Sequence, residues 1–269
     1  MTYRKRSEKS LQLETWSSPE VQRYIQKDNS FGIIPVGSFE QHGPHAPLGT
    51  DTFICMEVSR RLARKLGGVA LPPVWFGISD EHMDFAGTVT VAPDTLCNLI
   101  TDIVVSLRAA GFNKILVLNG HGGNVPYLGS VKEKVRQRVG QDVFLSVISY
   151  WDKLSERGKM MLSSLEWGFH ANEYETSLIS CIFPSMVKKL RDIRNYPDLS
   201  SLNDQELNEK VFRDLIKGSN GVWGDPGRAS IKKGRSFLGT IELSLNNYLA
   251  HELDSQNEDL AVKRVSKNW

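Results

Sequence analysis

Gly32-Ile-Ile-Pro-Val36 is the first of four short apolar segments from which we predict the fold. Short apolar runs rich in β-branched residues are typical of buried strands. The others span residues 69–74, 114–118 and 143–148, and helical patterns at residues 52–66, 93–110 and 126–139 separate them. This alternation predicts an α/β fold with three layers, α/β/α, around a largely parallel (mixed) central sheet.

The whole sequence, residues 1–269, fits one domain, with residues 1–29 as a polar N-terminal extension. Leu11, Leu13 and Trp16 are candidate anchors that dock this extension. Residues 199–207 are interpreted as a loop followed by a helix, and residues 230–253 as a packing helix at the end of the domain.

The charge pattern favours a small-molecule partner. The 33 Lys and Arg residues are spread among 31 acidic residues, giving a net charge of +2 without the basic stripe of a nucleic-acid-binding protein. No apolar run approaches the roughly 20 residues that a membrane span requires, and the first residues lack the apolar region of a secretory signal. Three cysteines in apolar stretches (Cys55, Cys97 and Cys181) are typical of reduced core thiols. We therefore expect a cytoplasmic protein that binds neither nucleic acid nor a membrane.

A candidate metal-binding stretch follows the first strand directly. Glu40 and His42 are two residues apart, so in an extended segment both side chains leave from the same face. Asp51 follows after a loop rich in glycine and proline. Two carboxylates and an imidazole, with no sulfur, suit Zn, Mn or Fe(II). Alone, a Glu-x-His pair is more often part of a solvated face.

Two further clusters strengthen this interpretation. Asn119-Gly-His-Gly-Gly-Asn124 follows the strand at 114–118, which places His121 at the carboxyl end of a parallel strand, where open α/β sheets build their sites. His170, Glu173 and Glu175 crowd the start of an apolar helix. The helix dipole favours carboxylates there even without a metal. His82, in the loop at 77–90, could face the site, but we interpret it as a hydrogen-bonded loop histidine.

These motifs, Glu-Gln-His-Gly with the following Asp, Asn-Gly-His-Gly-Gly-Asn and His-Ala-x-Glu-x-Glu-Thr-Ser, resemble the creatininase (creatinine amidohydrolase) family over roughly residues 30 to 250. The resemblance implies two divalent metal ions per subunit (Zn, Mn or Fe). Glu40, Asp51 and His121 would hold one, and His42, Asp51 and a further glutamate the other, with Asp51 as the bridge. It also implies a homo-oligomer, often a hexamer.

One ligand departs from creatininase itself, where the residue two after the loop histidine is a glutamate that serves the second metal. Gly123 occupies that position here. The resemblance implies that a glutamate of the His-Ala-x-Glu-x-Glu motif serves this metal instead. We nominate Glu175 and keep Glu173 in reserve, because the sequence spacing does not choose between them. The resemblance also makes His170 the catalytic acid/base. Candidate substrate-binding residues are Trp151, Gly122, Gly123 and Glu173.

The sequence therefore predicts a metal-dependent amidohydrolase that cleaves a C–N bond in a small cyclic or linear amide with metal-activated water. Other reactions in the family stay open, namely C–C hydrolysis of a diketo-inositol such as 3-dehydro-scyllo-inosose, deformylation of a formamide, and peptide trimming. A non-catalytic metal-binding subunit is the alternative outside enzymes.

Overall fold

Four parallel strands form the central sheet in the part of the chain that the structure describes. The structure, a computed structural model, describes residues 11–26, 30–140, 144–154, 170–189, 192–195 and 219–266. The strands are β1 (Phe31–Val36), β2 (Val69–Ala70), β3 (Lys114–Asn119) and β4 (Phe144–Ser149). They lie in the order β2-β1-β3-β4, and each neighbouring pair is parallel.

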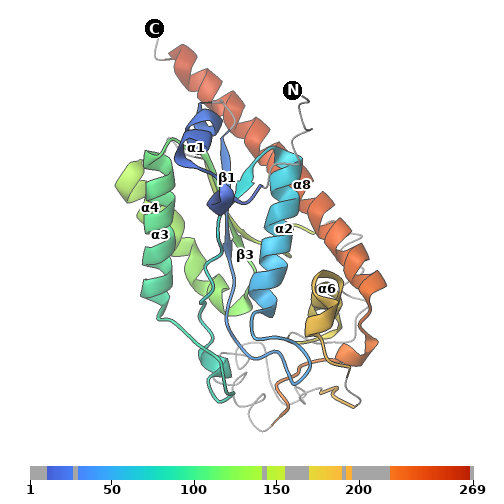
Figure 1. The fold of residues 1–269 in the computed structure, drawn as a ribbon. Coiled ribbons are helices and arrows are strands. Elements are labelled where there is room, and N and C mark those ends of the chain that lie inside the picture. The colour runs from blue at the N-terminus through green and yellow to red at the C-terminus, as the bar shows by residue number, and fades with distance from the viewer. Residues whose placement is uncertain are drawn as a thin grey trace.

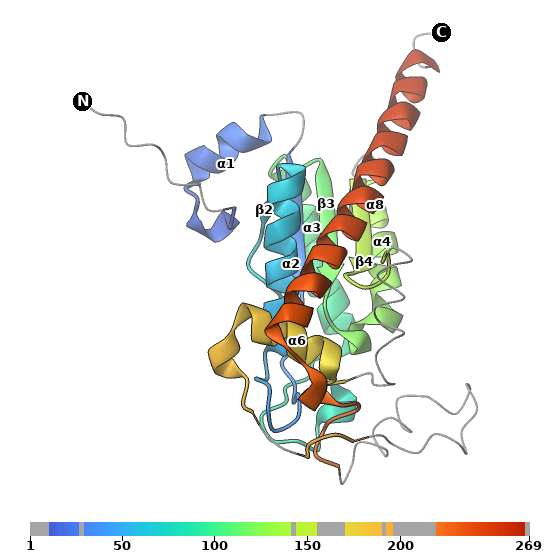
Figure 2. The same ribbon diagram turned by 90° about the vertical axis from the view of Figure 1, so that its right-hand side faces the viewer.

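Helices cover both faces of this sheet (Figure 1). On one side lie α2 (Thr50–Leu66), α6 (Glu173–Ile182) and α8 (Ile231–Ser266); on the other lie α3 (Pro93–Ala109) and α4 (Val125–Val139). Figure 2 shows α8 running diagonally past α2 and α6. No described helix, α8 included, is both long and apolar enough to cross a membrane.

The alternation of side chains along the strands divides the core in two. Ile33, Leu116 and Leu118 pack with α2, α6 and α8 in one cluster. Ile34 and Val117 pack with α3 and α4 in the other. Because successive residues of a strand point to opposite faces, a sheet buried on both sides needs such nearly continuous apolar strands. The predicted three-layer α/β/α fold is confirmed.

The second predicted strand is shorter than expected. Residues 69–74 were predicted as one strand, but β2 ends at Ala70. Pro72 and Pro73 carry no N–H for a ladder hydrogen bond. The chain returns to the sheet only at Val74, whose N–H donates to Pro35 O at 2.9 Å. The loop and helix predicted at 199–207 lie outside the described residues.

The described part of the N-terminal extension packs on the domain. Helix α1 (Ser18–Ile25) begins with a capping box between Ser17 and Glu20. The main-chain N–H of Ala70 donates to Leu11 O at 2.8 Å. Leu11 packs against the α2/α6/α8 cluster, and Leu13 and Trp16 against the other. These three side chains are docking anchors, as predicted.

Five 3-10 helices complete the described structure: η1 (Leu13–Thr15), η2 (Asp80–His82), η3 (Gly122–Asn124), η4 (Pro184–Met186) and η5 (Pro226–Arg228). Two of them, η2 and η3, belong to loops beyond the carboxyl ends of the strands. The polar motifs of the sequence converge at this end of the sheet.

Candidate metal centre

Asp51 is brought beside the exit of β1 by a close approach of two backbones. An added Cβ on Gly37 would lie 2.1 Å from Thr52 Oγ1 and 2.6 Å from Thr52 Cα, so only glycine permits this packing. Thr52 Oγ1 then donates to Ser38 O at 2.9 Å, and Ser38 Oγ donates to Asp51 Oδ2 at 2.9 Å. These bonds fix the Asp51 carboxylate in a buried position at the start of α2.

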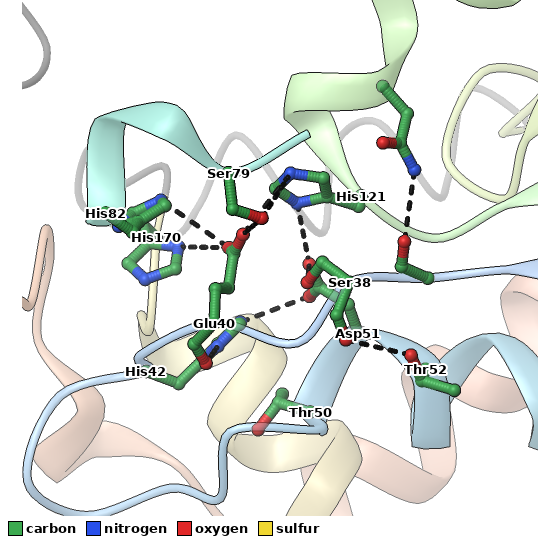
Figure 3. Close-up of polar contacts among 12 residues, drawn as sticks. Ser38, Glu40, His42, Thr50, Asp51, Thr52, Ser79, His82, His121 and His170 are labelled. Atoms are coloured by element: carbon green, nitrogen blue, oxygen red, sulfur yellow. Dashed lines mark hydrogen bonds and ion pairs between the residues drawn. The ribbon is translucent and has the colours of Figure 1, made fainter. Parts of the chain in front are cut away.

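Two imidazoles face this carboxylate from different loops (Figure 3). His42 Nε2 lies 3.1 Å from Asp51 Oδ1, and His121 Nδ1 lies 2.8 Å from Asp51 Oδ2. The second ring nitrogen of each faces a main-chain carbonyl: His42 Nδ1 lies 3.3 Å from Glu40 O, and His121 Nε2 lies 2.7 Å from Ile78 O. A carbonyl only accepts, so these nitrogens carry the proton and leave His42 Nε2 and His121 Nδ1 as ligand atoms, the arrangement usual for metal-binding histidines.

Two asparagines hold the loop that carries His121. Asn119 Nδ2 donates to His121 O at 2.7 Å, and His121 N–H donates to Asn119 Oδ1 at 3.2 Å. Asn124 Nδ2 donates to Gly37 O at 3.1 Å and Asn124 Oδ1 accepts from Ile78 N–H at 3.0 Å. The His121 loop is thereby tied to the segments that follow β1 and precede η2.

Glu40 lies against three histidines. Its Oε2 accepts from Ser79 Oγ at 2.6 Å and lies 3.3 Å from His121 Nε2. Its Oε1 lies 3.5 Å from His82 Nε2 and 3.7 Å from His170 Nδ1, yet this buried oxygen accepts no hydrogen bond from the described residues. Leaving a buried carboxylate oxygen without a donor is costly. A cation bound beside Oε1 would provide the partner that this oxygen lacks.

The third motif reaches the site through a strained backbone turn. Ala171 has φ +52°, a left-handed conformation that is uncommon for residues other than glycine. Its N–H donates to Glu175 Oε2 at 2.6 Å, and Asn172 Oδ1 caps α6 by accepting from the N–H groups of Tyr174 and Glu175. His170 lies just before this turn, its ring centroid 4.4 Å from that of His42.

Ligand atoms gather in three groups among the described residues, each within 4.8 Å. These groups are Glu40–Asp51–His121, His42–His170–Glu175 and Glu40–His82–His170. The first is the predicted ligand set of one metal. The second contains His42 and Glu175 as predicted, but His170 in place of Asp51, which remains next to His42.

Burial and proximity shift the pKa values of these groups. Burial alone would lower the pKa of His42 and of His121, but the surrounding carboxylates outweigh it and raise these values to about 9 and about 10. Loss of solvation raises the pKa of Glu40 and of Glu175 to about 7. Carboxylates crowded out of water disfavour negative charge, and a divalent cation offsets that cost. The nitrogen and oxygen donors fit Zn, Mn or Fe(II).

The other nominated residues lie in different surroundings. The Glu173 carboxylate accepts a hydrogen bond from Lys233 Nζ on α8 and lies 3.9 Å from Arg228 Nε on η5, so it belongs to an ion-pair cluster with these two basic residues. Trp151 packs edge-on against Tyr150, with ring centroids 4.8 Å apart. None of the three metal-ligand groups contains Glu173 or Trp151.

The two glycines after His121 differ in their surroundings. An added Cβ on Gly122 would meet nothing within 4 Å, whereas one on Gly123 would lie 2.1 Å from Ile78 O and 2.6 Å from His121 Nε2. Position 123 therefore has no room for a side chain in this loop conformation. A carboxylate for a second metal would have to come from elsewhere in the chain, and Glu175 is available in the group with His42 and His170.

The family model described as creatininase (creatinine amidohydrolase) matches residues 14–245. The chain belongs to the creatininase family. A mycofactocin precursor peptide peptidase of Mycobacterium ulcerans (strain Agy99) is 33% identical over 221 residues, covering 77% of this chain and 79% of that protein. A creatinine amidohydrolase of Pseudomonas putida is 26% identical over 197 residues, covering 68% of this chain and 75% of that protein. A crystal structure of creatinine amidohydrolase (creatininase) matches with a TM-score of 0.78 at 23% identity, covering 91% of this chain and 98% of that one, and so has the same fold.

Several residues of this creatininase-family site were not singled out in the sequence. Ser38 and Ser79 donate to Asp51 and Glu40, and Gln41 contacts His82 and His170. A single serine, or the glutamine inside the Glu-Gln-His-Gly motif, carries no signal of its own. His82 was interpreted as a hydrogen-bonded loop histidine; its Nδ1 does lie 2.9 Å from Gln41 Nε2, but its ring also lies 4.3 Å from that of His170, at the centre of the site. The folding of the loop at 77–90 over Glu40 puts it there.

Proposed function

We propose that this creatininase-family hydrolase uses two divalent metal ions to hydrolyse a C–N bond in a small cyclic or linear amide. The observation that carries the proposal is the pair of ligand groups on either side of Asp51, with the His170 ring beside both Glu40 and His42. Glu40, Asp51 and His121 would hold one ion, and His42, Asp51 and Glu175 the other. A bound divalent metal ion lowers the pKa of water and polarises a carbonyl group.

His170 has the geometry of a proton-transfer group. Its Nε2 lies 2.7 Å from Gln41 O, which requires the proton on Nε2 and leaves the Nδ1 lone pair towards Glu40. Burial, together with His82 and His42 close by, holds the pKa of His170 well below the usual 6.5. A neutral imidazole of this kind accepts a proton at Nδ1 and releases it readily to a leaving nitrogen.

The name of one relative supports an amide substrate. The mycofactocin precursor peptide peptidase acts on a peptide by its name, and a peptide bond is a linear amide. The creatinine amidohydrolase acts on a cyclic amide by its name. Both fit the same requirement, which is a carbonyl carbon beside the metal ligands and a leaving nitrogen within reach of His170.

The test is an amide-hydrolysis screen of the protein loaded with Zn or Mn, using cyclic amides, formamides and short peptides. We expect turnover by the wild type, and we expect His170→Ala to keep its metal content while losing roughly 10²- to 10⁴-fold in kcat. A fully active His170→Ala variant would remove His170 from the mechanism. If the metal-loaded wild type cleaves no amide but does cleave a diketo-inositol, the substrate class is wrong. Metal binding without any turnover would favour a non-catalytic subunit.

A further inference from the structure

Gln41 lies between Glu40 and His42 in the sequence, and its side chain is held in a single orientation. The main-chain N–H of Gly43 donates to Gln41 Oε1 at 2.8 Å, which identifies the oxygen of the amide. Gly221 packs against that oxygen so closely that an added Cβ would lie 2.0 Å from it. The Gln41 amide nitrogen therefore faces the other way, towards His82 and His170, at 2.9 and 3.0 Å.

This orientation decides where His82 carries its proton. An amide nitrogen only donates, so His82 Nδ1 accepts the bond from Gln41 Nε2. In the neutral ring the proton is then on Nε2, which points at Glu40 Oε1 from 3.5 Å. His82 thus offers an N–H rather than a lone pair to Glu40, and this N–H makes it unsuitable as a ligand for a third metal ion.

His170, in contrast, turns an unprotonated nitrogen towards the same oxygen, Glu40 Oε1. Its Nε2 lies 2.7 Å from the main-chain carbonyl of Gln41, so this nitrogen carries the proton. The Gln41 amide nitrogen is also 3.0 Å from His170 Nε2, but an N–H facing an N–H is no hydrogen bond, and the shorter carbonyl contact decides the tautomer. The unprotonated His170 Nδ1 is left 3.7 Å from Glu40 Oε1.

We propose that Gln41 is a positioning residue that sets the tautomers of both histidines. Its side-chain amide turns the His82 Nε2–H towards Glu40, and its main-chain carbonyl makes His170 Nδ1 a proton acceptor. At 3.5 Å the His82 N–H makes an electrostatic contact with Glu40 Oε1 rather than a hydrogen bond, and in this way it supports the carboxylate from outside the ligand set. The tautomers follow from the contacts alone, whereas their use in turnover rests on the proposed hydrolase function.

The deciding variant is Gln41→Glu, which has nearly the same shape. Its carboxylate still accepts from Gly43 N–H but no longer donates to His82, so the His82 proton moves to Nδ1. We expect imidazole 15N NMR of the zinc-loaded protein to show His82 protonated at Nε2 in the wild type and at Nδ1 in Gln41→Glu, with His170 protonated at Nε2 in both. Wild-type His82 protonated at Nδ1 would overturn the proposal whether or not a substrate has been found.

A matched pair at position 82 separates positioning from packing. His82→Gln places a donor near Glu40, whereas His82→Leu fills similar space without one. We expect roughly 10- to 100-fold weaker metal binding or lower kcat in His82→Leu, little change in KM, and substantial recovery in His82→Gln. Equal losses in both variants, or no loss in either, would contradict the proposed donor role. A wild type with three metals per chain that falls to two in His82→Leu would make His82 a ligand instead.

Discussion

At the scale of single residues, the two glycines of the His121 loop have different tasks. Gly123 lies where any side chain would collide with Ile78 O, the carbonyl that orients His121, whereas Gly122 faces open space. The sequence shows two adjacent glycines and cannot tell them apart. The difference arises from the segment around Ile78, which is more than 40 residues away along the chain.

Replacement of Gly123 is expected to disturb the metal site. In Gly123→Ala the loop has to move away from Ile78 O, which costs roughly 1–3 kcal/mol of unfolding free energy and displaces His121 from Asp51. Metal content should fall towards one ion per chain, measured by elemental analysis alongside denaturant unfolding. Gly122→Ala is the control and should change stability by no more than about 0.5 kcal/mol. Equal behaviour of the two variants would show that the collision at position 123 does not exist.

His45 is expected to make folding sensitive to acid. It is buried, and its Nε2 lies 2.8 Å from Thr176 Oγ1. Burial, with His42 nearby, lowers the pKa of His45 to about 4. The folded-state pKa is below the unfolded value of about 6.5, so this contribution to stability is present above pH 6.5 and is lost as the pH falls towards 4.

The corresponding measurement is unfolding free energy against pH for the metal-free protein. Between pH 7 and 4, His45→Gln should lose up to about 3 kcal/mol less than the wild type, since 1.36 kcal/mol corresponds to each pKa unit. Thr176→Val removes the same hydrogen bond but leaves the histidine, so its pH dependence should stay as steep as that of the wild type. If the unfolding free energy of His45→Gln depends on pH as steeply as that of the wild type, His45 is not the group responsible for the acid sensitivity.

The residue types of the site were predictable, but their supporting contacts were not. Glu40, His42, Asp51, His121 and Glu175 stand out because carboxylates and imidazoles recur after apolar runs. Ser79 and Gln41 do not stand out, because their importance lies in which atom they face. A donor 2.6 Å from Glu40 Oε2 is a property of the folded loop at 77–90 rather than of any local pattern.

At the scale of elements, the crossing of α6 and α8 controls where Glu175 lies. Gly234 on α8 packs so tightly that an added Cβ would lie 1.9 Å from Ser177 O and 2.8 Å from Cys181 Cβ, both on α6. Further along α8, an added Cβ on Gly239 would meet nothing within 4 Å. The helix was predicted from its amphipathic pattern, but the pattern does not reveal which of its glycines faces α6.

This contrast provides a test within one helix. Gly234→Ala should push α8 away from α6, lower the unfolding free energy by roughly 1–3 kcal/mol and weaken metal binding through Glu175. Gly239→Ala should raise stability by roughly 0.5–1 kcal/mol, because alanine is the better helix former. Thermal unfolding of the two variants measures both effects. Destabilisation of Gly234→Ala together with stabilisation of Gly239→Ala would support this packing, and a stabilised Gly234→Ala would contradict it.

At the scale of the whole molecule, the fold serves to bring three distant segments to one place. The loops after β1 and β3 meet because their strands are neighbours with carboxyl ends at the same edge of the sheet. Segment 170–175 joins them through α6, which packs against α2 and α8. The order of strands and helices was enough to predict the layers. Which loops meet depends on the strand order β2-β1-β3-β4, and alternation alone does not determine that order.

The metal content per chain is the decisive test of a two-metal site completed by Glu175. Protein purified without added metal, and the same protein after incubation with Zn or Mn, is compared with Glu175→Gln by elemental analysis. We predict about two ions per chain in the wild type and about one in Glu175→Gln, with both proteins folded. A wild type that binds no metal after incubation would contradict the metal centre. Two ions retained in Glu175→Gln would show that another residue completes it.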